Sequence, residues 1–406
     1  MASIDRQLRQ SGSDMPENLV LERGRQALLE YAWGDASDLL TRADADHPLE
    51  CGDLEQLAVA RFLTGQEEAS IDAWTRCYQR HVTAQEHEAA ARCAFWAGYQ
   101  SQVSGEMAHA QGWLAKAMQA LNEFPDDCAE RGYVHVPMAV GLMESGQLDE
   151  ARPHCAEALA TGRRLQDSTL VAMGTLCTAR VQLLSGETEQ GLRLLDEVMV
   201  SITAGEVLPQ VAGIIYCATI IACQEIFDLP RAHEWTRALS RWCELQQGLV
   251  PFRGQCLVHR AELMQMKGEW PDALEEVRLA RERLTDPPGQ PALGMAYYEE
   301  GELLRLRGEL SQAEAAFRHA HQLGHPPQPG LALLWLAQGK HDVAASAIRT
   351  ALDEVDGSVW RARLLPGAVE ILLAEGQPDA AHVAADELAE IATILGSPTL
   401  TAASDQ

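Results

Sequence analysis

The sequence has little of what marks membrane, secreted or nucleic-acid-binding proteins. No run of apolar residues reaches the roughly 18 that a transmembrane helix needs, and the nearest, "VAGIIYCATIIAC", is shorter. The start, "MASIDRQLRQSGSDMPENLV", lacks the cationic segment and apolar stretch of a secretory signal. Basic residues are scarce, 32 against 59 acidic ones, so the formal net charge is −27. Because this charge repels phosphate backbones and anionic lipids, we expect no direct binding to nucleic acids or membranes.

Catalytic and cofactor-binding motifs are also missing. There is no GxSxG, HExxH or GxGxxG motif and no GxxxxGK[ST] phosphate loop. The ten cysteines form neither CxxC pairs nor the spacing of a disulfide framework. We therefore expect free thiols in a cytoplasmic protein, with no enzymatic activity, no cofactor and no metal site.

The strongest candidate for a metal site is the stretch "CYQRHVTAQEHEAAARC", which contains Cys77, His81, His87 and Cys93. Cys77 and His81 are one helical turn apart and share a helical face. The intervening loop leaves the positions of the other two residues open. Ordinary helix packing and surface roles are therefore the favoured interpretation over a zinc site.

One short phrase recurs along the chain, as "VSGEMAHA", "MESGQLDEA", "LSGETEQG", "MKGEWPDA" and "LRGELSQA". Its glycines are Gly105, Gly146, Gly186, Gly268 and Gly308, and Phe227 stands at the remaining place of the series. Successive anchors are 40 or 41 residues apart. A catalytic motif occurs once, whereas a phrase that recurs at fixed spacing marks a structural repeat.

The residues around each anchor predict a helical hairpin. Strong helix formers dominate the sequence, and the anchor glycine suits the left-handed backbone that ends a helix. The residues seven places before and five places after the anchor are small, for example Ala261 and Ala273 around Gly268. Small residues on both sides of the turn allow two antiparallel helices to approach closely, and the hairpins must stack to bury their apolar faces.

This spacing resembles the tetratricopeptide repeat (TPR), over roughly residues 20–396. The repeat is longer than the usual length of about 34 residues, and the proline that ends each TPR is mostly absent. The longer repeat looks like the helical sensor region of large LuxR-type (maltose-activator-like) transcriptional regulators of actinobacteria. Stretches such as "HEAAARCAFWAG" and "GEVLPQVAGIIYCATIIACQEIFDL" carry this likeness. In that group a nucleotide-binding domain often precedes the array and a DNA-binding helix-turn-helix follows it.

The resemblance implies an all-α fold, a right-handed superhelical solenoid of TPR-like hairpins with a period of about 40 residues. We expect a polar leader over residues 1–19, the solenoid over 20–396, and a tail or the start of a further helix over 397–406. A stand-alone array is favoured over a piece of a longer regulator, because the chain begins with its own Met and a polar leader.

In TPR arrays the first helix of each hairpin lines a concave groove. The corresponding positions lie 13, 10, 6 and 3 residues before each anchor, and here they mix apolar residues with Arg, Gln, Glu and Tyr. Such a surface suits a protein, a peptide or a small-molecule ligand. From these positions and their flanks we predict that the binding residues are Tyr99, Tyr133, Arg180, Gln224, Arg253, Gln255, His259, Glu262, Gln265, Tyr298, Glu302 and Arg305.

The expected function is therefore a non-catalytic binding module, the sensor or regulatory part of a bacterial transcriptional regulator. An assembly scaffold is the alternative, and an enzyme hosted on the helical array is a further one. A further interpretation is that the groove binds nothing specific. Its charged residues could pair with each other, as Arg305 could with Glu302 one turn earlier.

Overall fold

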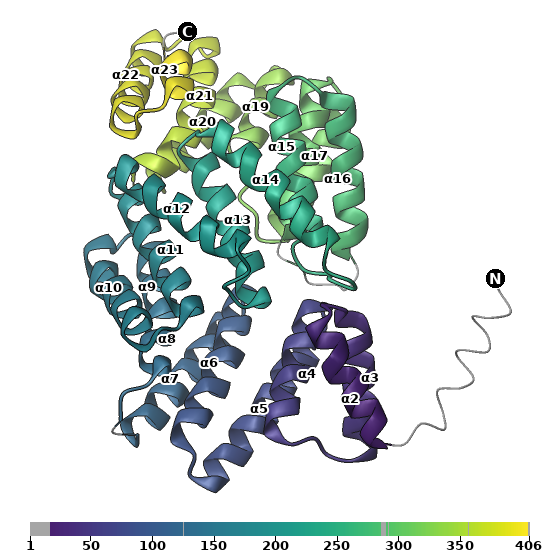
Figure 1. The fold of residues 1–406 in the computed structure, drawn as a ribbon. Helices are drawn as coiled ribbons and strands as arrows, with labels where there is room; N and C mark the ends of the chain where they lie inside the picture. The colour runs from purple at the N-terminus through teal and green to yellow at the C-terminus, as the bar shows by residue number, and fades with distance from the viewer. Residues whose placement is uncertain (1–16, 125, 286–289, 291, 356, 405–406) are drawn as a thin grey trace, which may run out of the picture. The chain divides into compact units, whose positions relative to one another are not determined.

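The structure, a computed structural model, describes residues 17–404 except for 125, 286–289, 291 and 356. Every element in these ranges is an α-helix, and they contain no β-strand beyond one isolated bridge between Ala32 and Gln247. The predicted all-α fold of helical hairpins is confirmed (Figure 1). The predicted leader, residues 1–19, lies largely outside the described residues.

None of the described helices is long and apolar enough to cross a membrane.

The helices group into two compact units, which are described separately. The first unit comprises Met1–Asp126 together with the later segment Trp242–Pro251, and the second comprises Asp127–Arg241 and Phe252–Gln406. The helices of the first unit are α2 (Glu17–Leu29), α3 (Trp33–Asp46), α4 (Cys51–Leu63), α5 (Glu67–Ala84), α6 (His87–Val103) and α7 (Met107–Asn122).

The later segment joins the first unit through backbone hydrogen bonds. Trp33 N donates to Gln247 O at 2.9 Å, and Val250 N donates to Leu63 O at 3.0 Å. The buried indole of Trp33 also donates from Nε1 to Oε1 of Gln246 at 2.8 Å. These bonds satisfy polar groups at the ends of α3 and α4 that would otherwise be buried without partners.

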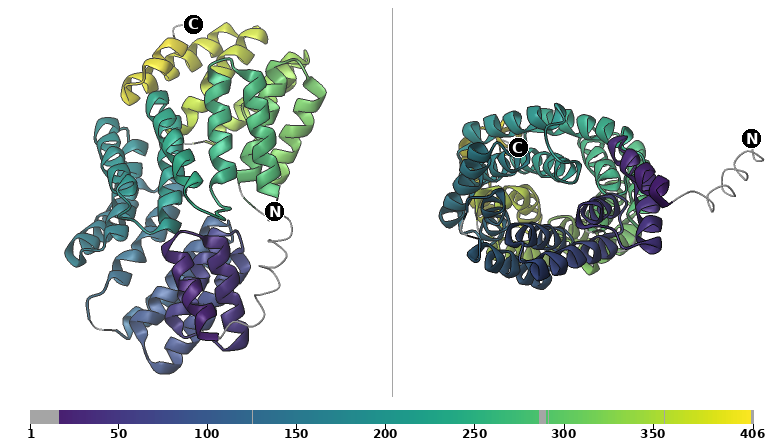
Figure 2. Two further views of the ribbon diagram at one scale, coloured as in Figure 1. Left: turned by 45° about the vertical axis from the view of Figure 1, so that its right-hand side comes forward. Right: turned by 60° about the horizontal axis from the view of Figure 1, so that its bottom comes forward.

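The second unit continues the series of antiparallel helices (Figure 2). Its first eight helices are α8 (Ala129–Tyr133), α9 (His135–Glu144), α10 (Leu148–Leu165), α11 (Ser168–Leu184), α12 (Thr188–Thr203), α13 (Pro209–Glu225), α14 (Leu229–Glu244) and α15 (Arg253–Met266). The others are α16 (Trp270–Thr285), α17 (Ala292–Leu306), α18 (Leu310–Gln322), α19 (Gly330–Ala337), α20 (His341–Asp353), α21 (Ser358–Ala374), α22 (Pro378–Leu395) and α23 (Pro398–Ser404).

The recurring phrase forms the turns between paired helices, as predicted. All five anchor glycines have φ between +74° and +81°, in the left-handed region. Phe227 takes the same conformation, with φ +58°, although it carries a side chain. Each turn leaves the same gap between helices, so that α15 ends two residues before Gly268 and α16 begins two residues after it.

The small residues on either side of a turn lie against each other. Ala261 and Ala273 are fully buried in one hydrophobic cluster. A Cβ atom added to Gly98 would lie 3.3 Å from the carbonyl oxygen of Ala110, twelve residues further on. The repeat therefore needs small side chains because the backbones of the paired helices come this close.

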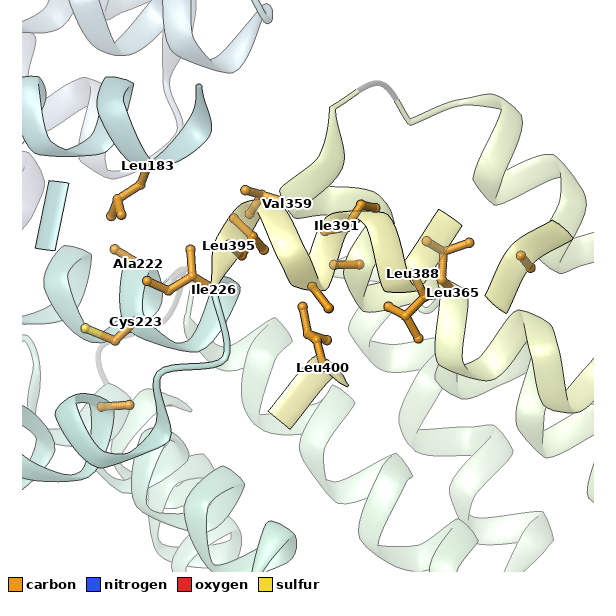
Figure 3. Packing of buried hydrophobic residues seen from close by; sticks show 14 of the residues in the cluster. Leu183, Ala222, Cys223, Ile226, Val359, Leu365, Leu388, Ile391, Leu395 and Leu400 are labelled. Carbon is orange, nitrogen blue, oxygen red and sulfur yellow. The ribbon is translucent and has the colours of Figure 1, made fainter. Parts of the chain in front are cut away.

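One hydrophobic cluster of the second unit joins helices that are far apart in sequence. The end of α11 and α13 pack against α21, α22 and α23 (Figure 3). The labelled members are Leu183, Ala222, Cys223, Ile226, Val359, Leu365, Leu388, Ile391, Leu395 and Leu400. Burying one such leucine or isoleucine stabilises a protein by roughly 1.5–3 kcal/mol. The first helices of these hairpins therefore contact the chain's own last helices.

Candidate functional site

Polar side chains gather on the first helices of the hairpins in the second unit. We name this set the inner-wall cluster. Its members are Gln224 on α13, His259 and Glu262 on α15, and Tyr298, Glu299, Glu302 and Arg305 on α17. The repeat brings these helices side by side, so residues at equivalent positions of successive hairpins meet.

Glu262 is the centre of the hydrogen bonds in the inner-wall cluster. Its Oε2 accepts from Nε2 of Gln224 at 2.5 Å and lies 3.1 Å from Nδ1 of His259. Burial works to raise the pKa of Glu262, but the hydrogen bonds from His259 and Gln224 and the charge of Arg363 outweigh it and lower the pKa. Glu262 is therefore a carboxylate at neutral pH.

Glu299 has the opposite character. Glu299 is 3% exposed, and its Oε1 has no hydrogen-bond partner among the described residues. Burial raises the pKa of Glu299 well above its usual range, and the negative charges of Glu262 and Glu302 raise it further. The pKa values of Glu262 and Glu299 are thus shifted in opposite directions, because donors hydrogen-bond to Glu262 whereas burial and like charges act on Glu299.

Glu302 and Arg305 form a two-point ion pair one turn apart. Arg305 donates from Nε to Oε1 of Glu302 at 3.1 Å and from Nη2 to Oε2 at 2.9 Å. A Cβ atom added to Gly330 would lie 2.4 Å from Oε1 of Glu302, so the start of α19 comes close to this pair. Arg305 neutralises the carboxylate of Glu302, and the start of α19 covers it.

Tyr298 and His325 close one end of the inner-wall cluster. Their ring centroids are 5.1 Å apart, and Tyr298 also lies edge-on to Phe317. Burial, followed by the positive charge of Arg363, lowers the pKa of His325 to about 4. His325 is therefore neutral near pH 7 and adds no positive charge here.

Arg363 on α21 differs from the other charged residues around the cluster. Its positive charge works to lower the pKa of Glu262, Tyr298 and His325, so it is near enough to all three for its charge to be felt. Arg363 is nevertheless exposed, and within the described ranges it makes no hydrogen bond or ion pair. Arg363 is therefore an exposed cation near the inner-wall cluster, and its guanidinium N–H groups have no acceptor among the described residues.

Several predicted site residues are brought together and others are not. Gln224, His259, Glu262, Tyr298, Glu302 and Arg305 all belong to the inner-wall cluster. Gln255 and Gln265 are half-buried on α15, the same helix as His259. Arg253 begins α15, but its side chain lies outside the described residues. Tyr99 belongs to the first unit, where its ring stacks on Phe95 with centroids 5.6 Å apart.

Two predicted site residues have partners inside the fold. The hydroxyl of Tyr133, a buried residue, donates to Asp167, and Asp167 caps α11 by accepting from Leu170 N at 2.9 Å. Arg180 forms an ion pair with buried Glu225. Both contacts hold neighbouring helices together, which is a structural role.

The sequence reasoning missed Glu299, His325 and Arg363. Glu299 follows Tyr298 directly, so the groove positions do not select it. His325 lies in the connection after α18, and Arg363 comes from a hairpin outside the regular spacing. No local motif could have assigned them to this cluster.

Metal-ligand geometry occurs elsewhere. Among the described residues, the set of three possible ligands close enough to share an ion is Glu55, His81 and Cys93, in the first unit. The inner-wall cluster contributes no such set, so its polar groups are suited to hydrogen bonding and ion pairing.

Comparison with known proteins shows a distant likeness to solved structures. No protein-family model and no curated protein matches the sequence. Among solved structures, the chain is similar to a tetratricopeptide repeat protein from Parabacteroides merdae, with 12% identity and a TM-score of 0.37, over 79% of this chain and 98% of that one. It is also similar to the APC/C hetero-tetramer Cut9–Hcn1, with 13% identity and a TM-score of 0.34, over 97% of this chain and 82% of that one. At these values the likeness transfers neither a partner nor a function.

Proposed function

We propose that this chain is a non-catalytic binding module that recognises a peptide segment of a partner protein at the inner-wall cluster and Arg363. The observation that carries the proposal is the state of Arg363. It is exposed and unpaired in the described part of the chain, while Glu262 is hydrogen-bonded, Glu302 is ion-paired with Arg305, and burial raises the pKa of Glu299. A guanidinium in this setting is available to a carboxylate from outside, with bidentate geometry.

The rest of the surface suits a polypeptide. Glu262 is an ionised acceptor for backbone or side-chain N–H groups. Gln255 lies one turn before His259 and two before Glu262, so it shares their helical face and offers both a donor and an acceptor. An acidic peptide segment would place its carboxylate at Arg363 and its backbone groups along α15.

The buried state of the potential acid–base groups supports a binding role over catalysis. The side chain of His259 is 0% exposed, and its Nε2 faces no partner in the described structure. Glu299 is also buried and is only 3% exposed to solvent. A general acid or base must come within hydrogen-bonding distance of the substrate, and these two groups are covered by protein.

A regulatory role in bacterial transcription is part of the proposal and is supported by the likeness of the repeat to LuxR-type sensor regions. Arg363 lies on α21, whose residue Val359 is buried in the cluster with α11 and α13. A partner that binds Arg363 would therefore contact a helix that is packed against hairpins far away in the sequence. The ten free cysteines agree with a reducing cytoplasm.

The test is selection of a displayed random peptide library on the immobilised full chain, followed by calorimetric titration of the enriched peptides. We expect enriched sequences to be acidic. Arg363→Ala should weaken their binding by about 10- to 100-fold, the equivalent of a charged hydrogen bond worth 1.5–3 kcal/mol. Gln255→Ala combined with Tyr298→Phe should weaken it further without changing the melting temperature greatly.

Arg237→Ala is the matched control, because Arg237 is an exposed arginine on α14, the second helix of its hairpin. The proposal fails if Arg237→Ala and Arg363→Ala weaken binding equally. It also fails if no peptide is enriched while small anionic metabolites raise the melting temperature of the parent but not of Arg363→Ala. That second result would identify a small-molecule sensor.

A further inference from the structure

Three helices of the first unit bring together side chains of the types that bind zinc. Glu55 lies on α4, His81 in the last turn of α5 and Cys93 on α6. One ligand atom from each lies within 4.8 Å of the other two. His81 and Cys93 are buried.

The distances agree with a shared tetrahedral ion. Nε2 of His81 and Sγ of Cys93 each lie 3.7 Å from Oε1 of Glu55. With the usual bond lengths of zinc to N, O and S, two ligands of a tetrahedral site are about 3.4–3.6 Å apart. The observed set needs to contract by only a few tenths of an ångström along these two edges to hold the ion.

The imidazole of His81 is oriented as in metal-bound histidines. Its Nδ1 lies 2.6 Å from Oε2 of Glu86, the residue before α6. Its Nε2 is buried and has no hydrogen-bond partner in the described chain, although it faces Glu55. A carboxylate on one ring nitrogen fixes the tautomer and leaves the other nitrogen free to bind a metal. A buried nitrogen without a partner is otherwise costly.

Cys77 supplies a fourth donor. It lies one turn before His81 on α5 and is fully buried. Its Sγ faces the carbonyl oxygen of Cys51, at 3.6 Å. The proposed site requires Sγ of Cys77 to turn from this carbonyl toward the other three ligands.

The surroundings also suit the charge of such a site. Two thiolates and one carboxylate around Zn²⁺ carry a net charge of −1. Arg92 donates from Nη2 and Nε to the two oxygens of Glu55, at 3.2 and 3.3 Å. The guanidinium would balance the excess charge and hold Glu55 in place when one carboxylate oxygen turns to the ion.

We propose that Glu55, Cys77, His81 and Cys93 bind one Zn²⁺ ion and thereby tie α4, α5 and α6 together. Four protein ligands, three of them buried, leave no open place for a substrate, so the site is structural. Binding replaces the protons of the two thiols, which leave to solvent as the zinc–sulfur bonds form. This site is independent of the inner-wall cluster, which lies in the other unit.

The first experiment measures metal in the parent chain. Protein purified anaerobically with a thiol reductant should contain one zinc per chain by elemental mass spectrometry. Replacement by Co²⁺ should produce the visible bands of tetrahedral cobalt and a near-ultraviolet thiolate-to-cobalt band. Substoichiometric zinc together with no thiolate band on cobalt titration would overturn the proposal, as would a Cys77–Cys93 disulfide in this reduced protein.

The second experiment compares matched variants by competition with a chromophoric chelator. Cys93→Ser and His81→Gln should lower zinc affinity by at least about 100-fold, and Glu86→Gln by about 10- to 100-fold with an unchanged tetrahedral cobalt spectrum. Cys77→Ser should weaken the thiolate band. The controls are His87→Gln, six residues from His81, and Cys155→Ser, a buried cysteine of the second unit. Loss of zinc in either control, or unchanged affinity in His81→Gln, would assign the metal elsewhere and overturn the site.

Discussion

Nη1 of Arg180 lies 2.5 Å from Oε2 of Glu225, and the side chain of Glu225 is only 3% exposed. Arg180→Met would leave the Glu225 carboxylate buried without its cation. We expect this change to lower the free energy of unfolding by about 3–5 kcal/mol, measured by urea denaturation. The double variant Arg180→Met with Glu225→Met should recover most of the loss, because no unpaired charge is left.

Arg193→Met is the control for this prediction. Arg193 pairs with Glu189 at 3.8 Å, but both side chains are more than 60% exposed. Its loss should change the free energy of unfolding by no more than about 1 kcal/mol. Equal effects of the two arginine substitutions would contradict the role assigned to Arg180.

Helix α17 and the side chain of Phe317 on α18 are packed too closely for any residue larger than glycine at position 301. A Cβ atom added to Gly301 would lie 2.7–3.0 Å from three atoms of the fully buried Phe317 ring. Gly301→Ala should therefore lower the free energy of unfolding by about 1–3 kcal/mol. Gly141→Ala, in α9 where the new Cβ atom meets nothing within 4 Å, should instead stabilise the protein by about 0.5–1 kcal/mol. If both substitutions changed the free energy of unfolding in the same direction, packing around the new Cβ atom would not explain the effect.

The anchor glycines are needed for their backbone conformation and not for space. Gly268 has φ +79°, and a Cβ atom there would contact nothing within 4 Å. Gly268→Ala should destabilise the protein by about 1–2 kcal/mol through backbone strain alone. Gly268→Asn should cost less, because asparagine adopts this conformation more readily. Thermal unfolding of the two variants checks the order, and a larger loss for Asn would refute the explanation.

Glu299 should make stability fall as the pH rises. The pKa of its carboxyl is raised in the folded state, whereas the pKa of a glutamate in an unfolded chain is about 4.3. Above that value the folded chain binds more protons than the unfolded one, so the stability that neutral Glu299 contributes is lost as pH rises through the folded pKa. Glu299→Gln stays neutral, and its advantage over the parent should grow from pH 5 to pH 8. Parallel urea midpoints across this range would rule out the shift.

The parts of the fold that depend on local sequence could be predicted. An anchor glycine such as Gly105 ends a helix through its own backbone, and a pair such as Ala261 and Ala273 meets because one short turn joins their helices. The repeat register also selected Gln224 and Glu262 as residues of one groove wall, and the structure shows them hydrogen-bonded to each other. These relations need only the spacing along the chain.

Contacts between distant segments could not be predicted in this way. The charge of Arg363 influences Glu262 because α21 packs against α13, a contact between hairpins that are far apart in the sequence. Glu55 is 26 residues before His81, on the preceding helix α4, so a search of one short stretch for metal ligands omits it. In both cases the sequence contains the residues but no local spacing that connects them.

The segment Trp242–Pro251 has a consequence for the order in which the chain matures on the ribosome. The first unit requires Gln246, Gln247 and Val250 to complete the hydrogen bonds of α3 and α4. These residues are made about 120 residues after Asp126, which is a delay of roughly 6–25 s at ordinary rates of synthesis. Until then Nε1 of Trp33 lacks its acceptor in the nascent first unit, whose last hydrogen bonds wait for a later part of the chain.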